Sequence, residues 1–196
     1  MKVELIDVFG SDNIVCGAAR VSFNKLAENY TPEQNSKLIQ YLAKHNHWSP
    51  FAHVSITMRE KVPIFVARQR FKHRIGFEYN EVSRRYVDDP PEFFTPTVWR
   101  SKPENAKQGS GEDVVDLWSF NWHDEPETEE QSCGWDWWSI GEELKEMYSR
   151  IEQTYKRMVE VGVAPEQARM ILPQSLYTGY YCTGSLAAWA RAYKLR

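Results

Sequence analysis

Residues 68–86 read RQRFKHRIGFEYNEVSRRY, and the organisation of the chain can be worked out from this stretch. Seven basic or imidazole side chains surround a single Glu-x-Ser, formed by Glu81 and Ser83. They are Arg68, Arg70, Lys72, His73, Arg74, Arg84 and Arg85. Such a cluster suits an anion-binding site, although solvated surfaces and nucleic-acid patches also carry many cations.

The first part of this stretch is predicted to be helical. Pro63 suits the first position of a helix, where its fixed φ is favourable. The 3.6-residue period then gives the helix an inward face, made by Ile64, Ala67 and Phe71. A second face, which we expect to hold an anion, is made by Gln69, Lys72 and His73 at i, i+3 and i+4.

Beyond Gly76 the pattern becomes extended. Alternation with a period of two would direct Glu81, Ser83 and Arg85 to one side of a strand or an extended loop. A single carboxylate would then be flanked by two cationic surfaces, one helical and one extended.

Other segments show clear strand and helix patterns. Strands are predicted over residues 3–9 and 54–58, and helices over residues 12–20, 32–46 and 139–162. Thr31, Pro32 and Gln34 form the sequence of a capping box at the start of the second helix. A short helix opens at Pro165 and is closed by Pro173. This mixture predicts an α+β fold with a mainly antiparallel sheet flanked by helices.

Composition places the chain among globular proteins. It has 196 residues, of which 42% are hydrophobic and 14% aromatic, which is enough for one sizeable core and argues against disorder. We expect a single domain. No apolar run is long enough to span a bilayer, and the N-terminal sequence lacks the pattern of a signal peptide. We therefore expect a soluble, cytoplasmic protein without a membrane partner, and read Cys16, Cys133 and Cys182 as reduced thiols.

Charge is distributed unevenly along the chain. Residues 112–143 hold eleven acidic side chains and no Lys or Arg, which leaves 24 basic and 16 acidic residues elsewhere. A body near +8 suits ligands that carry phosphate. The acidic stretch also holds five tryptophans, so we expect a surface insertion at about 108–140 whose tryptophans pack on the body. An interaction surface is the alternative.

The segment KHRIGFEYNEVSRRY, residues 72–86, resembles the signature of the flavin-dependent thymidylate synthases, which is R-H-R followed by seven residues and Ser. The signature lies inside the longer pattern R-H-R-x-x-S-x-N-E-x-S-x-R-Y, and the residues that match it are His73, Arg74, Asn80, Glu81, Ser83, Arg85 and Tyr86. Lys72 replaces the first Arg of the signature, and eight residues separate Arg74 from Ser83. We expect a turn near residues 76–78 to absorb the extra residue. The resemblance implies an α+β fold of the thymidylate synthase-complementing protein type.

Two further segments carry the same resemblance. HNHWSPFAH, residues 45–53, is similar to the His-x-His-x-x-Pro-Phe-x-His element of the family, which lies against the flavin. ARMILPQSLYT, residues 168–178, is similar to A-R-[IV]-x-L-P-x-x-x-Y-T, and the final Leu-Arg also matches. Some relatives have Asn, Arg and Asn where this chain has Ser185, Ala187 and Arg191.

The resemblance implies reductive methylation of dUMP to dTMP by a methyltransferase. Methylenetetrahydrofolate would supply the carbon, NADPH would reduce FAD, and the reduced flavin would supply the hydride. Arg196 is the implied catalytic residue, because it would stabilise charge on the uracil. The family is a homotetramer whose sites combine residues from several subunits.

The same resemblance implies the ligand contacts. For dUMP they are Gln69, Arg70, Phe71, Lys72, Glu81, Val82, Ser83, Arg84, Arg85, Arg169 and Arg196. For FAD they are His47, Ser49, Lys72, His73, Arg74, Glu81, Ser185 and Arg191.

The histidines, Ser83 and Cys182 suggest alternative sites. A metal at His45, His47 and His53 is disfavoured, because no carboxylate or cysteine lies nearby in the sequence and Pro50 interrupts the segment, so we predict no metal. Ser83 with His73 as its base, or Cys182, could be read as nucleophiles. The cations around Ser83 favour binding, and nothing near Cys182 would lower its pKa.

Two alternative functions also remain open on the sequence. Phe71, Phe77 and Tyr79 lie among the cations, as in a platform for single-stranded nucleic acid. Glu81 argues against that function, since a carboxylate would repel the phosphate backbone. A relative that binds flavin or nucleotide without turnover is the other alternative, motivated by Lys72 and by the extra residue.

Overall fold

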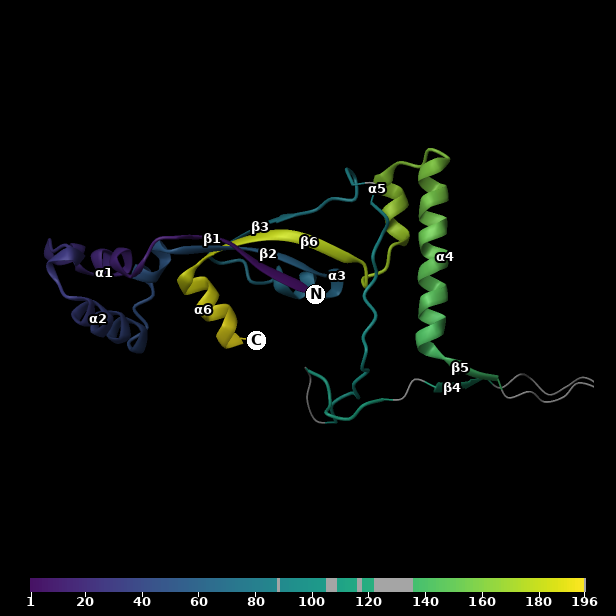
Figure 1. The fold of residues 1–196 in the computed structure, drawn as a ribbon, viewed down its shortest axis with the longest axis horizontal. Coiled ribbons are helices and arrows are strands. Elements are labelled where there is room, and N and C mark those ends of the chain that lie inside the picture. The colour runs from purple at the N-terminus through teal and green to yellow at the C-terminus, as the bar shows by residue number, and fades with distance from the viewer. Residues whose placement is uncertain (88, 105–108, 116–117, 122–135, 196) are drawn as a thin grey trace, which may run out of the picture. The chain divides into compact units, whose positions relative to one another are not determined.

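The computed structural model describes residues 1–87, 89–104, 109–115, 118–121 and 136–195 (Figure 1). The chain divides into two compact units. The first unit comprises Met1–Ser83 and Tyr177–Arg196, and the second comprises Arg84–Leu176. Much of the predicted insertion at 108–140 lies outside the described residues. A single domain with this insertion therefore stays a prediction.

The first unit is built on a four-stranded sheet. Its strands are β1 (Lys2–Phe9), β2 (Ser55–Pro63), β6 (Tyr177–Ser185) and β3 (Phe77–Glu81), in the order β1-β2-β6-β3. Every neighbouring pair is antiparallel, and Figure 1 shows the long β6 in the middle of the sheet. The predicted α+β fold with a mainly antiparallel sheet is confirmed.

Two helices cover one face of this sheet, which we call the inner face. Ala67 of α3 (Ile64–Arg70) and Ala188 of α6 (Leu186–Leu195) belong to the same buried cluster as Val62, Phe77 and Tyr180 from three strands. The small alanine side chains let both helices approach the sheet closely. The predicted inward face of α3 is therefore confirmed at Ala67, which is 1% exposed.

A second cluster lies where α1 (Asp12–Arg20) and α2 (Pro32–Lys44) meet the 3-10 helix η3 (Ser49–His53). Val15, Leu42 and Val54 form its buried centre, and Leu38 and Ile39 pack against it. The predicted capping box is present: Thr31 Oγ1 accepts the Gln34 N–H at 3.3 Å, and Gln34 Oε1 accepts the Thr31 N–H at 2.9 Å. These contacts fix the start of α2.

Thr31→Ala is expected to lower the free energy of unfolding by about 1 kcal/mol, because the first turn of α2 loses a capping acceptor. Ser11→Ala is a matched control. Ser11 occupies the N-cap of α1, but among the described residues its side chain makes no capping hydrogen bond. Urea unfolding of both variants checks the prediction, and equal losses would contradict it.

Two predictions about the 68–86 stretch are wrong in detail. The helix ends at Arg70, because the Lys72 and His73 N–H groups bond to carbonyls three residues back, in turns that tighten the chain. Lys72 and His73 therefore share no helical face with Gln69. Strand β3 ends at Glu81, its last residue paired with β6, and Arg85 lies in a turn.

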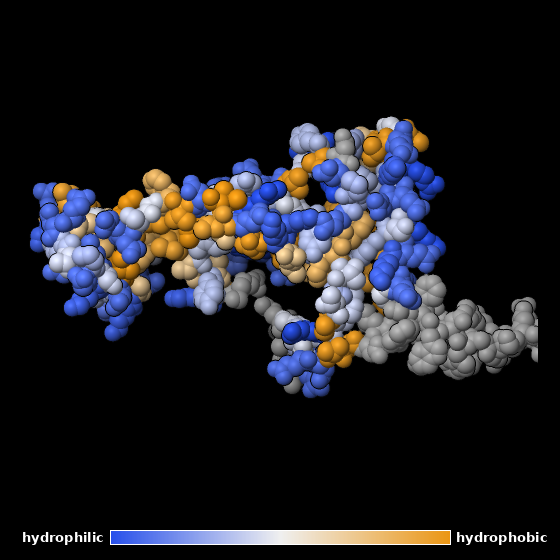
Figure 2. Space-filling model, in the orientation of Figure 1, coloured by the Kyte–Doolittle hydropathy of each residue, from blue (hydrophilic) through white to orange (hydrophobic). Residues whose placement is uncertain are grey.

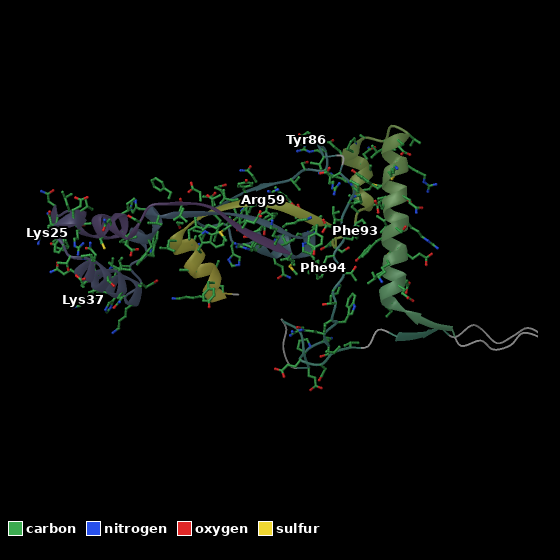
Figure 3. The ribbon with its side chains drawn as sticks, viewed as in Figure 1. Lys25, Lys37, Arg59, Tyr86, Phe93 and Phe94 are labelled. Atoms are coloured by element: carbon green, nitrogen blue, oxygen red, sulfur yellow. The ribbon has the colours of Figure 1, made fainter. Side chains whose placement is uncertain are left out.

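The second unit contains β4 (Trp118–Asn121), β5 (Asp136–Ser139), the long helix α4 (Ile140–Glu160) and the short helices α5 (Pro165–Ala168) and η4 (Arg169–Ile171). Gly162, with φ +89°, follows α4 as predicted. Phe93 and Phe94, labelled in Figure 3, lie on an extended segment. The Phe93 ring stacks on Tyr148 of α4 with centroids 4.8 Å apart, and the Tyr148 hydroxyl donates to the Phe94 carbonyl at 3.3 Å.

Strand β1 leaves apolar side chains exposed at the edge of the sheet. Val3, Leu5 and Val8 pair with Glu60, Met58 and Ile56, which places them on the inner face. They are 58%, 61% and 48% exposed. Figure 2 shows apolar surface gathered over the strands of this unit. We call these three residues the β1 stripe. Across the part of the chain that is described, no helix has the length and apolar character needed to cross a membrane.

Candidate functional site

The loop at residues 71–76 carries Lys72, His73 and Arg74 and is fixed by a tyrosine beneath it. The Tyr79 hydroxyl lies 2.9 Å from the His73 carbonyl and 3.3 Å from the Arg70 carbonyl. The loop closes at Gly76, where φ is +76° and an added Cβ would lie 2.9 Å from Ala188. A turn is therefore present close to the predicted position, but it lies at residues 75–76, because Phe77 and Glu78 already belong to β3. The positive φ of Gly76 favours glycine there.

A buried carboxylate lies below this loop. Glu60 of β2 is 6% exposed. Its Oε1 accepts a hydrogen bond from Arg70 Nη2 at 2.9 Å, and its Oε2 accepts one from the Tyr180 hydroxyl at 2.6 Å. Arg70, predicted from the resemblance to contact dUMP, thus has its guanidinium directed into the core. That contact stays a prediction.

This network was not predicted from the sequence. Val54, Ile56, Met58, Glu60 and Val62 share one face by the period-two rule, and Glu60 is the charged member of that series. A charge on a buried face requires a partner. The signal was therefore available in β2, but the partner Tyr180 lies 120 residues away in the chain.

Glu81 is the last residue of β3, at the end of the strand away from the 71–76 loop, and its side chain is held by a hydrogen bond. The Thr178 hydroxyl donates to Glu81 Oε1 at 2.7 Å, and the Val82 N–H donates to the Gly179 carbonyl at 2.8 Å. Thr178 is 5% exposed, whereas Glu81 is exposed. A buried hydroxyl therefore orients a solvent-accessible carboxylate that the resemblance assigns to both ligands.

Two groups in the core under the loop, Tyr79 and Cys182, have raised pKa values. Burial raises the pKa of Tyr79 from 10.0 to about 12. Burial likewise raises the pKa of Cys182, which is 0% exposed, from 9.0 to about 11. A thiol with a raised pKa is a poor nucleophile, which agrees with the prediction that Cys182 is not one. Cys16 is also a free, buried thiol, and Cys133 lies outside the described residues.

These shifts predict a loss of stability at alkaline pH. Because both groups bind their protons more tightly in the folded state, their stabilisation is complete below about pH 9 and is lost as the pH rises to about 12. We expect the free energy of unfolding to fall by roughly 2–4 kcal/mol across this window. Urea titrations at several pH values measure it. Tyr79→Phe should flatten the upper part of the curve, and an unchanged slope would contradict the assignment.

A cavity of about 570 Å³ lies in the first unit. Its apolar wall includes Leu42, Phe51, Ile75 and Leu186, and its polar members are Asn46, His47, Arg191 and Lys194. Arg191 also donates to the Ile75 carbonyl, which ties α6 to the 71–76 loop. The cavity thus brings together His47 and Arg191, two of the residues predicted to contact FAD. Ser49 begins η3, and Ser185 ends β6.

The remaining predicted contacts lie in both units. In the first unit Gln69, Lys72 and Arg74 are exposed, Val82 is 47% exposed, and the Phe71 ring packs on Tyr79 and Tyr180 with centroids 4.9 and 4.8 Å apart. Ser83 is half-buried.

In the second unit Arg84 donates to the Asp89 and Pro90 carbonyls. Arg85 lies 3.4 Å from Glu166, and Arg169 begins η4. The Arg85–Glu166 pair is solvent-exposed, so the pair itself contributes little to stability. Arg196 lies outside the described residues.

No group of three or more His, Cys, Asp and Glu side chains that could hold a metal is found among the described residues. His45 and His47 instead lie beside the Tyr41 ring, with centroids 4.3 and 6.2 Å away. The absence of a metal stays a prediction.

Comparison with known proteins adds independent information. Residues 4–196 match the family described as "Thymidylate synthase complementing protein". A protein named flavin-dependent thymidylate synthase from Thermosipho melanesiensis is 39% identical over 184 residues, which cover 92% of this chain and 70% of that protein. One of the same name from Thermotoga neapolitana is 38% identical over 181 residues, covering 92% and 69%.

A solved structure is also similar. The UMP/dUMP methylase PolB from Streptomyces cacaoi, bound with 5-Br dUMP, matches with a TM-score of 0.69 and 29% sequence identity. The match covers 95% of this chain and 73% of that one. The resemblance seen in three sequence segments therefore extends through the whole fold, and the chain belongs to the family of thymidylate synthase complementing proteins.

Proposed function

We propose that this protein is a flavin-dependent thymidylate synthase, which methylates dUMP reductively to dTMP. The observation that carries the proposal is Glu81, an exposed carboxylate held by the buried hydroxyl of Thr178 on the same strand pair that fixes the cation-bearing 71–76 loop. Relatives with the flavin-dependent thymidylate synthase name and a methylase bound with a dUMP analogue support the reaction.

The cavity suits part of a flavin. Its apolar wall of Leu42, Phe51 and Leu186 fits a flat ring, and its size is that of a typical cofactor pocket. Arg191 and Lys194 add positive charge, which suits phosphate groups. We assign FAD to this region, with His47 and Arg191 as contacts in the cavity, and with Ser49, Lys72, His73, Arg74, Glu81 and Ser185 as further contacts. When bound, the reduced flavin supplies the hydride that completes the methyl group.

The nucleotide is assigned to the cationic residues and the oriented carboxylate. Lys72 and Gln69 are exposed, and the backbone of the 71–76 loop is fixed by Tyr79, so little backbone entropy is lost when these side chains bind an anion. The resemblance also assigns Phe71, Val82, Ser83, Arg84, Arg85 and Arg169 to the nucleotide, and we propose each as a contact on that ground. Bidentate arginine contacts suit a phosphate group well.

Arg196 is the proposed catalytic residue. Uracil is a poor electrophile and its C5 atom is a poor nucleophile, so methylating it requires stabilisation of the negative charge that develops when electrons are added to the ring. A guanidinium cannot be deprotonated near neutral pH and serves that purpose without a proton transfer. We propose methylenetetrahydrofolate as the carbon donor and NADPH as the reductant.

We also propose a homotetramer with active sites between subunits. The β1 stripe supports self-association, because Val3, Leu5 and Val8 present apolar surface at an open sheet edge. Light scattering combined with size-exclusion chromatography measures the assembly, and a monomer that turns over substrate would contradict inter-subunit sites.

An absorbance titration tests the function. The purified protein is expected to show flavin bands at about 450 nm, which is the flavin's own absorption, and these bands are expected to shift when dUMP is added. Turnover with methylenetetrahydrofolate and NADPH then separates an enzyme from a relative that only binds. A colourless protein that cannot be reconstituted with FAD and binds single-stranded nucleic acid with steep salt dependence would overturn the proposal.

A further inference from the structure

The Glu60–Arg70–Tyr180 network is largely buried. The Glu60 and Arg70 side chains are 8% and 20% exposed. The Arg70 guanidinium lies 4.9 Å from the Trp189 ring and 5.4 Å from the Phe77 ring, so aromatic faces enclose it as well. Apolar residues of similar volume often replace a buried ion pair without loss of stability. A pair of this kind therefore points to a need for a defined geometry.

The anchored position of Arg70 in turn fixes the 71–76 loop, which carries Lys72, His73 and Arg74. Arg70 is the last residue of α3, and its side chain is held by β2 through Glu60 and, through Glu60, by Tyr180 of β6. Its backbone carbonyl accepts from Tyr79 of β3, and the same hydroxyl reaches the His73 carbonyl. Contacts with three strands therefore fix the position of the last residue of α3 and of the backbone that carries Lys72 and His73.

We propose that Arg70 is a positioning residue, anchored by Glu60 and Tyr180, and that it holds the 71–74 segment in the geometry that binds dUMP without contacting the nucleotide itself. The inference rests on the proposed function, because it concerns the same ligand. It replaces the direct Arg70–dUMP contact implied by the resemblance with an indirect role.

The distinguishing measurement is the Kd of dUMP, read from the shift of the flavin spectrum at a temperature well below the Tm of each variant. Under these conditions a group that only stabilises the fold leaves the Kd unchanged. Glu60→Gln, Tyr180→Phe and Arg70→Met are each expected to weaken dUMP binding by about tenfold, since each releases the same anchor. Neither Glu60 nor Tyr180 is accessible to dUMP, because they are 6% and 2% exposed.

Non-additivity provides the second criterion. The double variant Glu60→Gln with Arg70→Met is expected to bind about as weakly as Arg70→Met alone, because the second change acts on an anchor that is already lost. If Arg70 contacted dUMP directly, the losses of dUMP affinity in the two single variants would add in the double variant, or only Arg70→Met would lose affinity.

Tyr181→Phe is the matched control. Tyr181 is the next residue of β6, points to the outer face opposite Arg59, which is labelled in Figure 3, and is 46% exposed. The Tyr181→Phe variant should bind dUMP with the same Kd as the wild-type protein. Tyr180→Phe removes a single oxygen atom, so it keeps the test available if Glu60→Gln does not fold.

The outcomes separate the two proposals. Wild-type protein that binds dUMP, with Glu60→Gln and Tyr180→Phe binding equally well, would overturn the inference and leave the function intact. Wild-type protein that binds flavin but never dUMP would overturn the proposed function and the inference with it.

Discussion

Replacing Gly184 with alanine is expected to lower the Tm of the protein by roughly 10 °C, equivalent to about 3 kcal/mol of unfolding free energy. Gly184 lies on the inner face of β6 opposite Phe77. A Cβ at this position would lie 2.5 Å from two atoms of the Phe77 ring and 3.1 Å from Trp189 Nε1. The Phe77 ring cannot move away without disturbing its edge contact with Trp189, whose centroid is 5.0 Å away.

Gly17→Ala is the matched control for this experiment. Gly17 lies inside α1, and nothing within 4 Å would meet its added Cβ. Because alanine is a better helix former than glycine, this variant should gain up to about 1 kcal/mol. Calorimetry of both variants measures the difference. A Gly184→Ala protein with an unchanged Tm would show that the core over β6 is loosely packed.

Replacing Arg196 with alanine is expected to lower kcat/KM by about 10²–10³, the usual cost of removing one group that stabilises developing charge. The flavin spectrum should be retained, because Arg196 is assigned to the uracil and not to the cofactor. The Arg196→Lys variant should retain only part of the activity, since lysine has a single charged nitrogen and not the planar guanidinium group of arginine.

Arg150→Ala is a suitable comparison, because Arg150 is an exposed arginine of α4 whose partner is Glu146. It should retain full activity. Steady-state turnover with dUMP, methylenetetrahydrofolate and NADPH measures both variants. An Arg196→Ala protein within about tenfold of wild type would exclude a catalytic role, since such a loss is smaller than charge stabilisation provides.

Local signals predicted much of the fold correctly. The capping box at Thr31 and Gln34 depends on residues three apart, and the end of α4 depends on Gly162, so both could be derived from short segments. Strand β6 could not be derived in this way, because Gly179 and Gly184 interrupt a run of Tyr, Thr and Cys that otherwise favours a strand. Its central position became evident only from pairing with β2 and β3.

The sequence predicts which residues belong to the candidate site, but it does not predict how they are positioned relative to one another. The motif at residues 72–86 contained Lys72, Glu81 and Ser83, but helical periodicity was extended too far, since nothing in the local sequence shows that the turns tighten after Arg70. The Thr178–Glu81 and Tyr180–Glu60 contacts join residues 97 and 120 positions apart. Such contacts follow from strand register, which the sequence specifies only through the whole sheet.

The alternation of β6 makes the site sensitive to chain length. Thr178, Tyr180, Cys182 and Gly184 occupy successive inner-face positions, and each serves a different neighbour. A single inserted or deleted residue within 177–185 would turn those beyond it to the opposite face, because side chains in a strand alternate. Evolution can therefore change the identity of residues along β6 one at a time, but it can change the spacing only by rebuilding the sheet and the site together.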